Sequence, residues 1–115
     1  MPVVKIYGVT ATVTEEELQD FCKDLARVIT KVEPLGLTEE MITFFFPQDM
    51  MIFGLGEEII IFVDGLFVKP ERTSEVRKEL ARQIGFTTRV RFPAARTECF
   101  VRPFDPDQGF WSSGE

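Results

Sequence analysis

The residue with the clearest potential for chemistry is Pro2, which precedes the extended apolar run of residues 3–7. If the initiator methionine is removed, as the small residue behind it should permit, Pro2 becomes a free secondary amine at the head of a strand. An amino-terminal amine has a pKa of about 7.7 to 8.0, so a useful fraction is neutral at neutral pH and can act as a base. A structural explanation stays open, because proline is also tolerated at the first residue of a strand.

The other side chains exclude several kinds of site. The chain has no histidine, which removes Ser-His and Cys-His triads, imidazole metal ligands and the commonest general base. Its only thiols, Cys22 and Cys99, form no CxxC pair and lie among apolar residues. We therefore expect two buried structural thiols in preference to a disulfide or a redox pair.

The composition is that of one globular domain, residues 1–115, with 44% hydrophobic and 28% charged residues. A formal net charge of -6 repels a phosphate backbone, so nucleic acid is not an expected partner. No apolar run approaches the roughly 20 residues that a membrane span needs. No basic region followed by an apolar segment opens the sequence, and we expect a cytoplasmic protein without a membrane partner.

The first half of the chain predicts a strand, a helix and a strand. Residues 14–17, Thr-Glu-Glu-Glu, have the form of a capping box, so a helix should begin there. Its apolar positions recur every three or four residues as far as Val32, and Pro34 ends the pattern. Residues 41–46 are apolar except at Thr43, which predicts a buried strand.

The second half predicts the same order. Residues 59–63 are the strongest strand signal in the chain, and the Asp-Gly pair after them should end the strand. A second helix should start at Pro70 or Ser74 and end at Gly85. Residues 87–92, where arginines alternate with apolar residues, and residues 99–101 are predicted to be extended.

The two halves are related by an internal repeat. Residues 23–29 and 78–84 are nearly the same seven residues at an offset of 55, and this offset also superposes the apolar positions of residues 4–7 on those of residues 59–62. Pseudo-repeats 2–47 and 57–102 then give an α+β fold of order βαββαβ, with a four-stranded sheet and two helices on one face. The order allows either a ferredoxin-like sheet or two parallel βαβ units side by side.

The C-terminal tail, residues 103–115, has no period and contains Phe104, Phe110 and Trp111. Left free, the tail would expose three large aromatic side chains. We expect it to dock on its own subunit or on a neighbour.

Three segments carry a resemblance to a known family: residues 1–4, residues 25–31 and residues 46–54. In these segments the chain resembles the tautomerase superfamily, the group that includes macrophage migration inhibitory factor and carboxymethyl-hydroxymuconate isomerase. Residues 92–97 look most like an uncharacterised bacterial subgroup. The resemblance implies a duplicated βαβ chain of the two-layer, MIF-like fold that assembles as a homotrimer.

The resemblance also implies a cofactor-independent tautomerase or isomerase in which Pro2 is the catalytic base. Pro2 would take a proton alpha to a carbonyl of a small acidic keto or enol compound and return it to another carbon. Arg96 is the preferred substrate clamp, because its planar fork binds a carboxylate in two places, and Lys31 is similar by position to a substrate-side lysine. Lys31 equally fits a helix C-terminal cation, and Arg96 an intersubunit salt bridge.

Three functions therefore compete. The first is the tautomerase using Pro2, and the second is the same trimeric scaffold acting as a non-catalytic module that binds a small ligand or a protein. The third is a ferredoxin-like regulatory domain. An intact Met1 would count against the first, and a dimer without threefold symmetry would favour the third.

Overall fold

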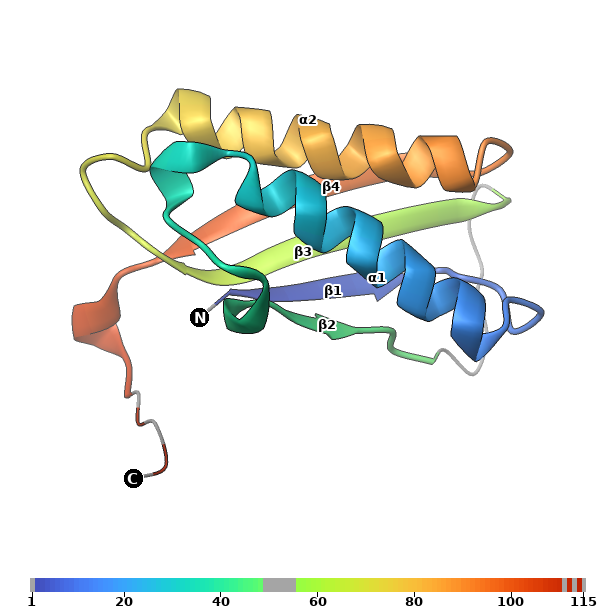
Figure 1. Cartoon of the computed structure of the whole chain (residues 1–115), viewed down its shortest axis with the longest axis horizontal. Helices are drawn as coiled ribbons and strands as arrows, with labels where there is room; N and C mark the ends of the chain where they lie inside the picture. The colour runs from blue at the N-terminus through green and yellow to red at the C-terminus, as the bar shows by residue number, and fades with distance from the viewer. Residues whose placement is uncertain (1, 49–55, 111, 113, 115) are drawn as a thin grey trace.

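The fold has two layers, a four-stranded sheet and two helices that cover one of its faces (Figure 1). The computed structural model describes residues 2–48, 56–110, 112 and 114. The strands are β1 (Val3–Tyr7), β2 (Thr43–Phe45), β3 (Glu58–Phe67) and β4 (Arg96–Phe104), and the helices are α1 (Glu15–Thr30) and α2 (Ser74–Arg91). Three short 3-10 turns complete it: η1 (Glu33–Leu35), η2 (Glu39–Met41) and η3 (Pro106–Gln108). The predicted α+β architecture is confirmed.

The strand order is β2-β1-β3-β4. Strand β1 runs parallel to β2, and β3 runs parallel to β4, so each half is a parallel βαβ unit. The halves meet where β1 pairs antiparallel with β3. Of the two predicted outcomes, the arrangement of two parallel units side by side is the one found. The antiparallel junction places the end of β3 beside the start of β1.

Both helices begin at side-chain caps. The Thr14 hydroxyl accepts from the Glu17 N–H at 3.1 Å, and the Glu17 carboxylate accepts from the Thr14 N–H at 3.2 Å, which confirms the capping box. Helix α2 starts at Ser74, one of the two predicted starts, because the Thr73 hydroxyl accepts from the Val76 N–H at 3.3 Å.

The core lies between the sheet and the helices. Alternate residues of the two central strands face it, as the period of a half-buried sheet requires. Fully buried side chains come from both repeats: Val4, Ile6, Phe21, Leu25, Ile61, Leu80 and Ile84. Cys22 and Cys99 are only half-buried, and burial raises the pKa of Cys99 to about 12, so this thiol is unreactive at neutral pH.

Helix α2 does not end at Gly85 but continues to Arg91, so the predicted strand over residues 87–92 is wrong. The buried Thr88 fits the longer helix, since its hydroxyl donates to the Ile84 carbonyl at 2.8 Å. Two arginines in the last turn also suit the negative end of the helix dipole. Arg89, Val90 and Arg91 are all exposed in the last turn, so the alternation of arginine with apolar residues did not mark the two faces of a strand.

Three strands differ from prediction in their limits. Strand β2 is short, and its Phe45, which faces away from the helices, is 54% exposed. The prediction of a buried strand is therefore wrong for this face. Strand β3 passes through Asp64 and continues to Phe67, with an irregularity in its pairing with β4 at Gly65. Gly65 has φ 75°, a conformation that favours glycine. Strand β4 starts at Arg96, earlier than predicted.

The tail is docked in part. The Phe104 ring packs against the Phe67 ring at 6.3 Å, and the Phe104 carbonyl accepts from the Val68 N–H at 3.0 Å. Phe110 is 94% exposed and does not dock on its own subunit. Trp111 lies outside the described residues, as does most of residues 46–54. No described helix is long and apolar enough to cross a membrane.

Candidate active site

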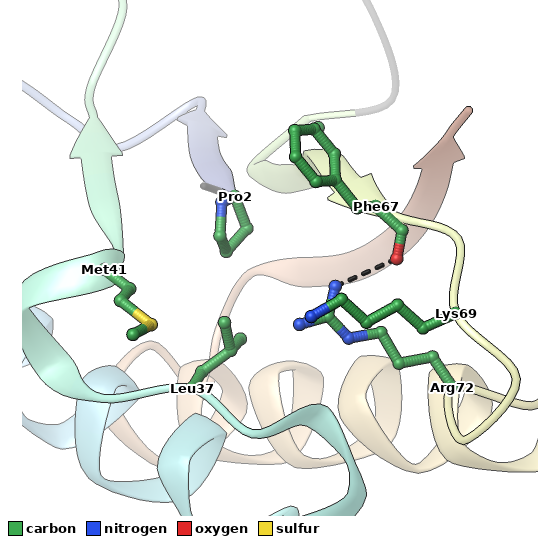
Figure 2. Close-up of a pocket in the computed structure, with 7 residues that line it drawn as sticks. Pro2, Leu37, Met41, Phe67, Lys69 and Arg72 are labelled. Atoms are coloured by element: carbon green, nitrogen blue, oxygen red, sulfur yellow. Dashed lines mark hydrogen bonds between the residues drawn. The ribbon is translucent and has the colours of Figure 1, made fainter. Parts of the chain in front are cut away.

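A cleft of about 210 Å³ opens at the amino-terminal end of β1 (Figure 2). It is lined by residues from both repeats: Pro2, Leu37, Met41, Gly65, Phe67, Lys69 and Arg72. The first three come from the first repeat. Gly65 and Phe67 belong to the end of β3, and Lys69 and Arg72 to the loop before α2. The antiparallel pairing of β1 with β3 explains why these two parts of the chain meet.

Pro2 is buried at the head of β1, and its ring faces the cleft between Leu37 and Phe67 (Figure 2). Its carbonyl accepts from the Thr43 N–H at 3.3 Å, which extends the pairing of β1 with β2 by one residue. A proline without a backbone N–H costs no ladder hydrogen bond at the start of a strand, as expected. The fold thus fixes the place of Pro2 from its carbonyl side.

Arg72 is the most unusual residue of the cleft, because it is charged and only 6% exposed. Its Nε and Nη2 donate to the Leu35 carbonyl at 3.2 and 2.7 Å, and its Nη1 donates to the Phe67 carbonyl at 2.9 Å. Burial lowers the pKa of Arg72, and the nearby Glu71 opposes this shift. Among the described residues no carboxylate lies within 4.0 Å of its guanidinium.

Lys69 supplies a second cation at the cleft. It is exposed, and in Figure 2 its side chain runs from the loop before α2 toward the cleft, in the same direction as Arg72. No described acidic side chain lines the cleft. Two positive charges in a lining that contains no described carboxylate favour an anionic ligand.

The rest of the cleft is apolar. Leu37, Met41 and Phe67 line this part, and Figure 2 shows Met41 on the side away from Lys69 and Phe67 on the same side as Lys69. The cleft therefore offers a cationic side and an apolar side to one small molecule. Within the described part of the chain, no group of three or more Cys, Asp and Glu side chains is placed to hold a metal ion.

Neither predicted clamp lines this cleft. Lys31 is the exposed C-cap residue of α1, where its N–H donates to the Arg27 carbonyl at 3.3 Å. Arg96 begins β4 opposite Glu58, whereas Pro2 lies beside the far end of β3. Six to seven strand residues separate these ends, or roughly 20 Å. One subunit therefore does not bring Arg96 to Pro2.

Lys69 and Arg72 were missed because the sequence alone did not show how the halves pair. A signal was present, since both residues lie between a predicted strand and a predicted helix start. Once β1 is known to pair antiparallel with β3, the loop after β3 must lie beside Pro2. The sequence shows both cations, but it does not show the strand pairing that brings them to Pro2.

Solved structures show which proteins share this fold, although no family model matches the sequence and the search of curated proteins finds no match. Macrophage migration inhibitory factor from Toxoplasma gondii is 17% identical, with a TM-score of 0.70 over 98% of this chain and 96% of that one. A symmetric trimer of fused 4-OT is 12% identical, with a TM-score of 0.73 over 98% and 94%. A DUF1904 domain of unknown function from Sebaldella termitidis is 21% identical, with a TM-score of 0.68 over 100% and 98%.

These likenesses cover nearly the whole of each chain, so they concern the complete two-layer architecture and not one repeat. The DUF1904 domain also fits the resemblance to an uncharacterised bacterial subgroup. The resemblance found in the sequence is confirmed as a likeness of fold, and the chain has the fold of the tautomerase superfamily.

Proposed function

We propose that the chain is a cofactor-independent tautomerase or isomerase that uses Pro2 as general base on a small acidic keto or enol compound. The observation that carries the proposal is that Pro2 and the buried Arg72, which has no carboxylate within 4.0 Å among the described residues, line one cleft. A buried cation without a carboxylate partner is costly, and an anionic ligand would offset that cost. The apolar side accommodates the remainder of the ligand.

The reaction needs two proton transfers and no electron acceptor. The neutral Pro2 amine takes the proton from the carbon alpha to the carbonyl, and the electron pair of the broken C–H bond forms the enolate. The protonated amine then returns the proton to a different atom of the delocalised system. Burial and the two nearby cations both disfavour the ammonium form, so they favour a neutral amine at neutral pH.

Lys69 is the proposed contact for the substrate carboxylate. It is exposed at the cleft and has no acidic partner within 4.0 Å among the described residues. Lys31 and Arg96 remain proposed substrate contacts, but neither lines the cleft within one subunit. Each can contribute only through a larger ligand or from another subunit.

A homotrimer would supply that other subunit. The sheet face away from the helices presents an aromatic strip in which Phe62 stacks on Phe100 at 5.7 Å and Tyr7 packs edge-on to Phe62 at 6.0 Å. Phe45 on the same face is 54% exposed. Such a face needs a cover, and the symmetric trimer of fused 4-OT supports a threefold arrangement.

The second candidate is a non-catalytic module of the same fold. It is favoured if Met1 is retained, because Pro2 would then be an amide and the cleft would keep only its cations and its apolar side. Intact mass decides whether the chain begins at Pro2, and ketonisation of phenylenolpyruvate measures the activity. Turnover by protein with a free Pro2 supports the enzyme. Binding without turnover by the same protein supports the module.

A further inference from the structure

We propose that Arg72 is a positioning residue that sets the width of the Pro2 cleft. It does so by bridging two main-chain carbonyls that belong to opposite walls of the cleft. These are the carbonyls of Leu35, at the end of η1, and Phe67, at the end of β3. The bridge follows from the geometry alone. Its expected effect on turnover rests on the function proposed for Pro2.

The two carbonyls belong to segments that line the cleft. Leu35 is 1% exposed and precedes Leu37 by two residues, with Gly36 between them at φ 65°. Phe67 itself lines the cleft, on the side from which Lys69 reaches it. A side chain that holds both carbonyls therefore fixes Leu37 relative to Phe67, the two side chains between which Pro2 lies (Figure 2).

Arginine suits this bridge and lysine does not. The guanidinium is planar, and its donors point in fixed directions, so Nε and Nη2 can share one carbonyl while Nη1 reaches another. An ammonium is a point charge on a flexible stem and would hold one carbonyl at a time. Both carbonyls end their elements, and without Arg72 the buried Leu35 carbonyl and the partly buried Phe67 carbonyl would each lose this donor.

The bridge leaves part of the guanidinium available. Three of its five N–H groups are used, which leaves one on Nη1 and one on Nη2. The bridge therefore also holds the positive charge at a fixed place in the lining of the cleft. Arg72 acts on the reaction through the placement of these walls and of this charge.

Arg77 provides a matched control. It lies in the first turns of α2, just after the loop that carries Arg72. It is half-buried, and its Nη1 donates to a main-chain carbonyl, that of Arg72 itself. Arg77 does not line the cleft. Lysine substitutions at the two positions remove similar bonds, but only Arg72→Lys opens the bridge.

The experiment compares Arg72→Lys with Arg77→Lys in the full chain. For Arg72→Lys we expect kcat on phenylenolpyruvate to fall about 10- to 100-fold, with KM changed less than about threefold, because misplaced groups reduce rate more than affinity. For Arg77→Lys both constants should stay within about twofold. A raised KM with unchanged kcat in Arg72→Lys would make Arg72 a simple carboxylate contact and overturn the proposal.

A second measurement needs no variant and no turnover. In ¹⁵N-labelled wild-type protein, the Arg72 Nε–H should exchange slowly with solvent and show cross-peaks to residue 35, whereas the Arg77 Nε–H should exchange fast. Fast exchange at Arg72 would overturn the bridge even if Arg72→Lys failed to fold. If no enol is turned over but Arg72 is protected, the bridge stands and only the role of Pro2 fails.

Discussion

Asp64 holds Arg102 through both carboxylate oxygens on the sheet face away from the helices. One of these bonds, from Nη2, measures 2.6 Å, and the Lys5 ammonium lies 3.2 Å from the same carboxylate. The Arg102 guanidinium also lies over the Phe62 ring, 4.2 Å from its centre. This ionic cluster sits at the edge of the aromatic strip defined above.

Asp64 should make the stability of the fold depend on pH. Bonding to Arg102 first, and to Lys5, holds the pKa of Asp64 below its usual value, so its contribution is present above the unfolded value of about 3.9. That contribution is lost as the pH falls through the lower folded value. We expect Asp64→Asn to cost about 1 kcal/mol at pH 7 by urea unfolding, and the difference from wild type to shrink below about pH 4. A difference that grows on acidification would contradict the assignment.

Substitution of Pro2 should reduce turnover without removing it. Pro2→Ala keeps an amine at the same end of the chain, primary and differently placed, so a large but incomplete loss of kcat/KM is expected on phenylenolpyruvate. A variant that retains Met1, verified by intact mass, masks Pro2 as an amide and should be inactive. Full activity with Met1 in place would exclude Pro2 as the base.

Removal of Lys69 should weaken substrate binding. Lys69→Met loses a charged contact, so KM for an acidic enol should rise about tenfold with kcat within about threefold. Lys78→Met, on the exposed surface of α2, removes the same charge away from the cleft and should leave both constants unchanged. Equal effects of the two would mean that only net charge matters.

The proposed homotrimer predicts different effects of substitution at two exposed phenylalanines. Phe100, on the uncovered sheet face, is 47% exposed, and Phe86, on α2, is 70% exposed. Phe100→Glu should dissociate the assembly at micromolar concentration in sedimentation, whereas Phe86→Glu should not, because a buried charge at an interface is costly. A monomeric wild type would contradict the trimer.

Arg96→Ala should weaken the binding of acidic substrates while the protein stays trimeric. If the variant instead dissociates early, Arg96 belongs to the subunit interface.

Gly8 should tolerate no side chain. Its φ is 92°, and a Cβ there would lie 2.1 Å from the Glu58 carbonyl oxygen. We expect Gly8→Ala to destabilise the fold by more than about 2 kcal/mol in urea unfolding. Gly36→Ala, at φ 65° with no atom within 4 Å, should cost only about 1 kcal/mol. Similar costs at both positions would rule out the clash as the cause.

Sequence patterns predicted what depends on local chemistry. The capping box at Thr14 and the apolar face of α1 both appear in the fold, because each depends on residues a few positions apart in the sequence. The end of α2 was mispredicted, since arginines at alternate positions fit a strand and the last turns of a helix equally well. The cations of the cleft were missed because their proximity to Pro2 depends on pairing between distant strands.

The two copies of the repeat differ in the residues that precede and begin their helices. The offset of 55 that aligns the helices puts Lys69 at the position of Thr14, and Arg72 at that of Glu17. In the first copy those positions cap α1, but in the second the cap lies at Thr73, about one helical turn later. Because α2 starts about one turn later than α1 relative to the repeat, the second copy carries two cations where the first carries its capping box, and these cations line the cleft beside Pro2.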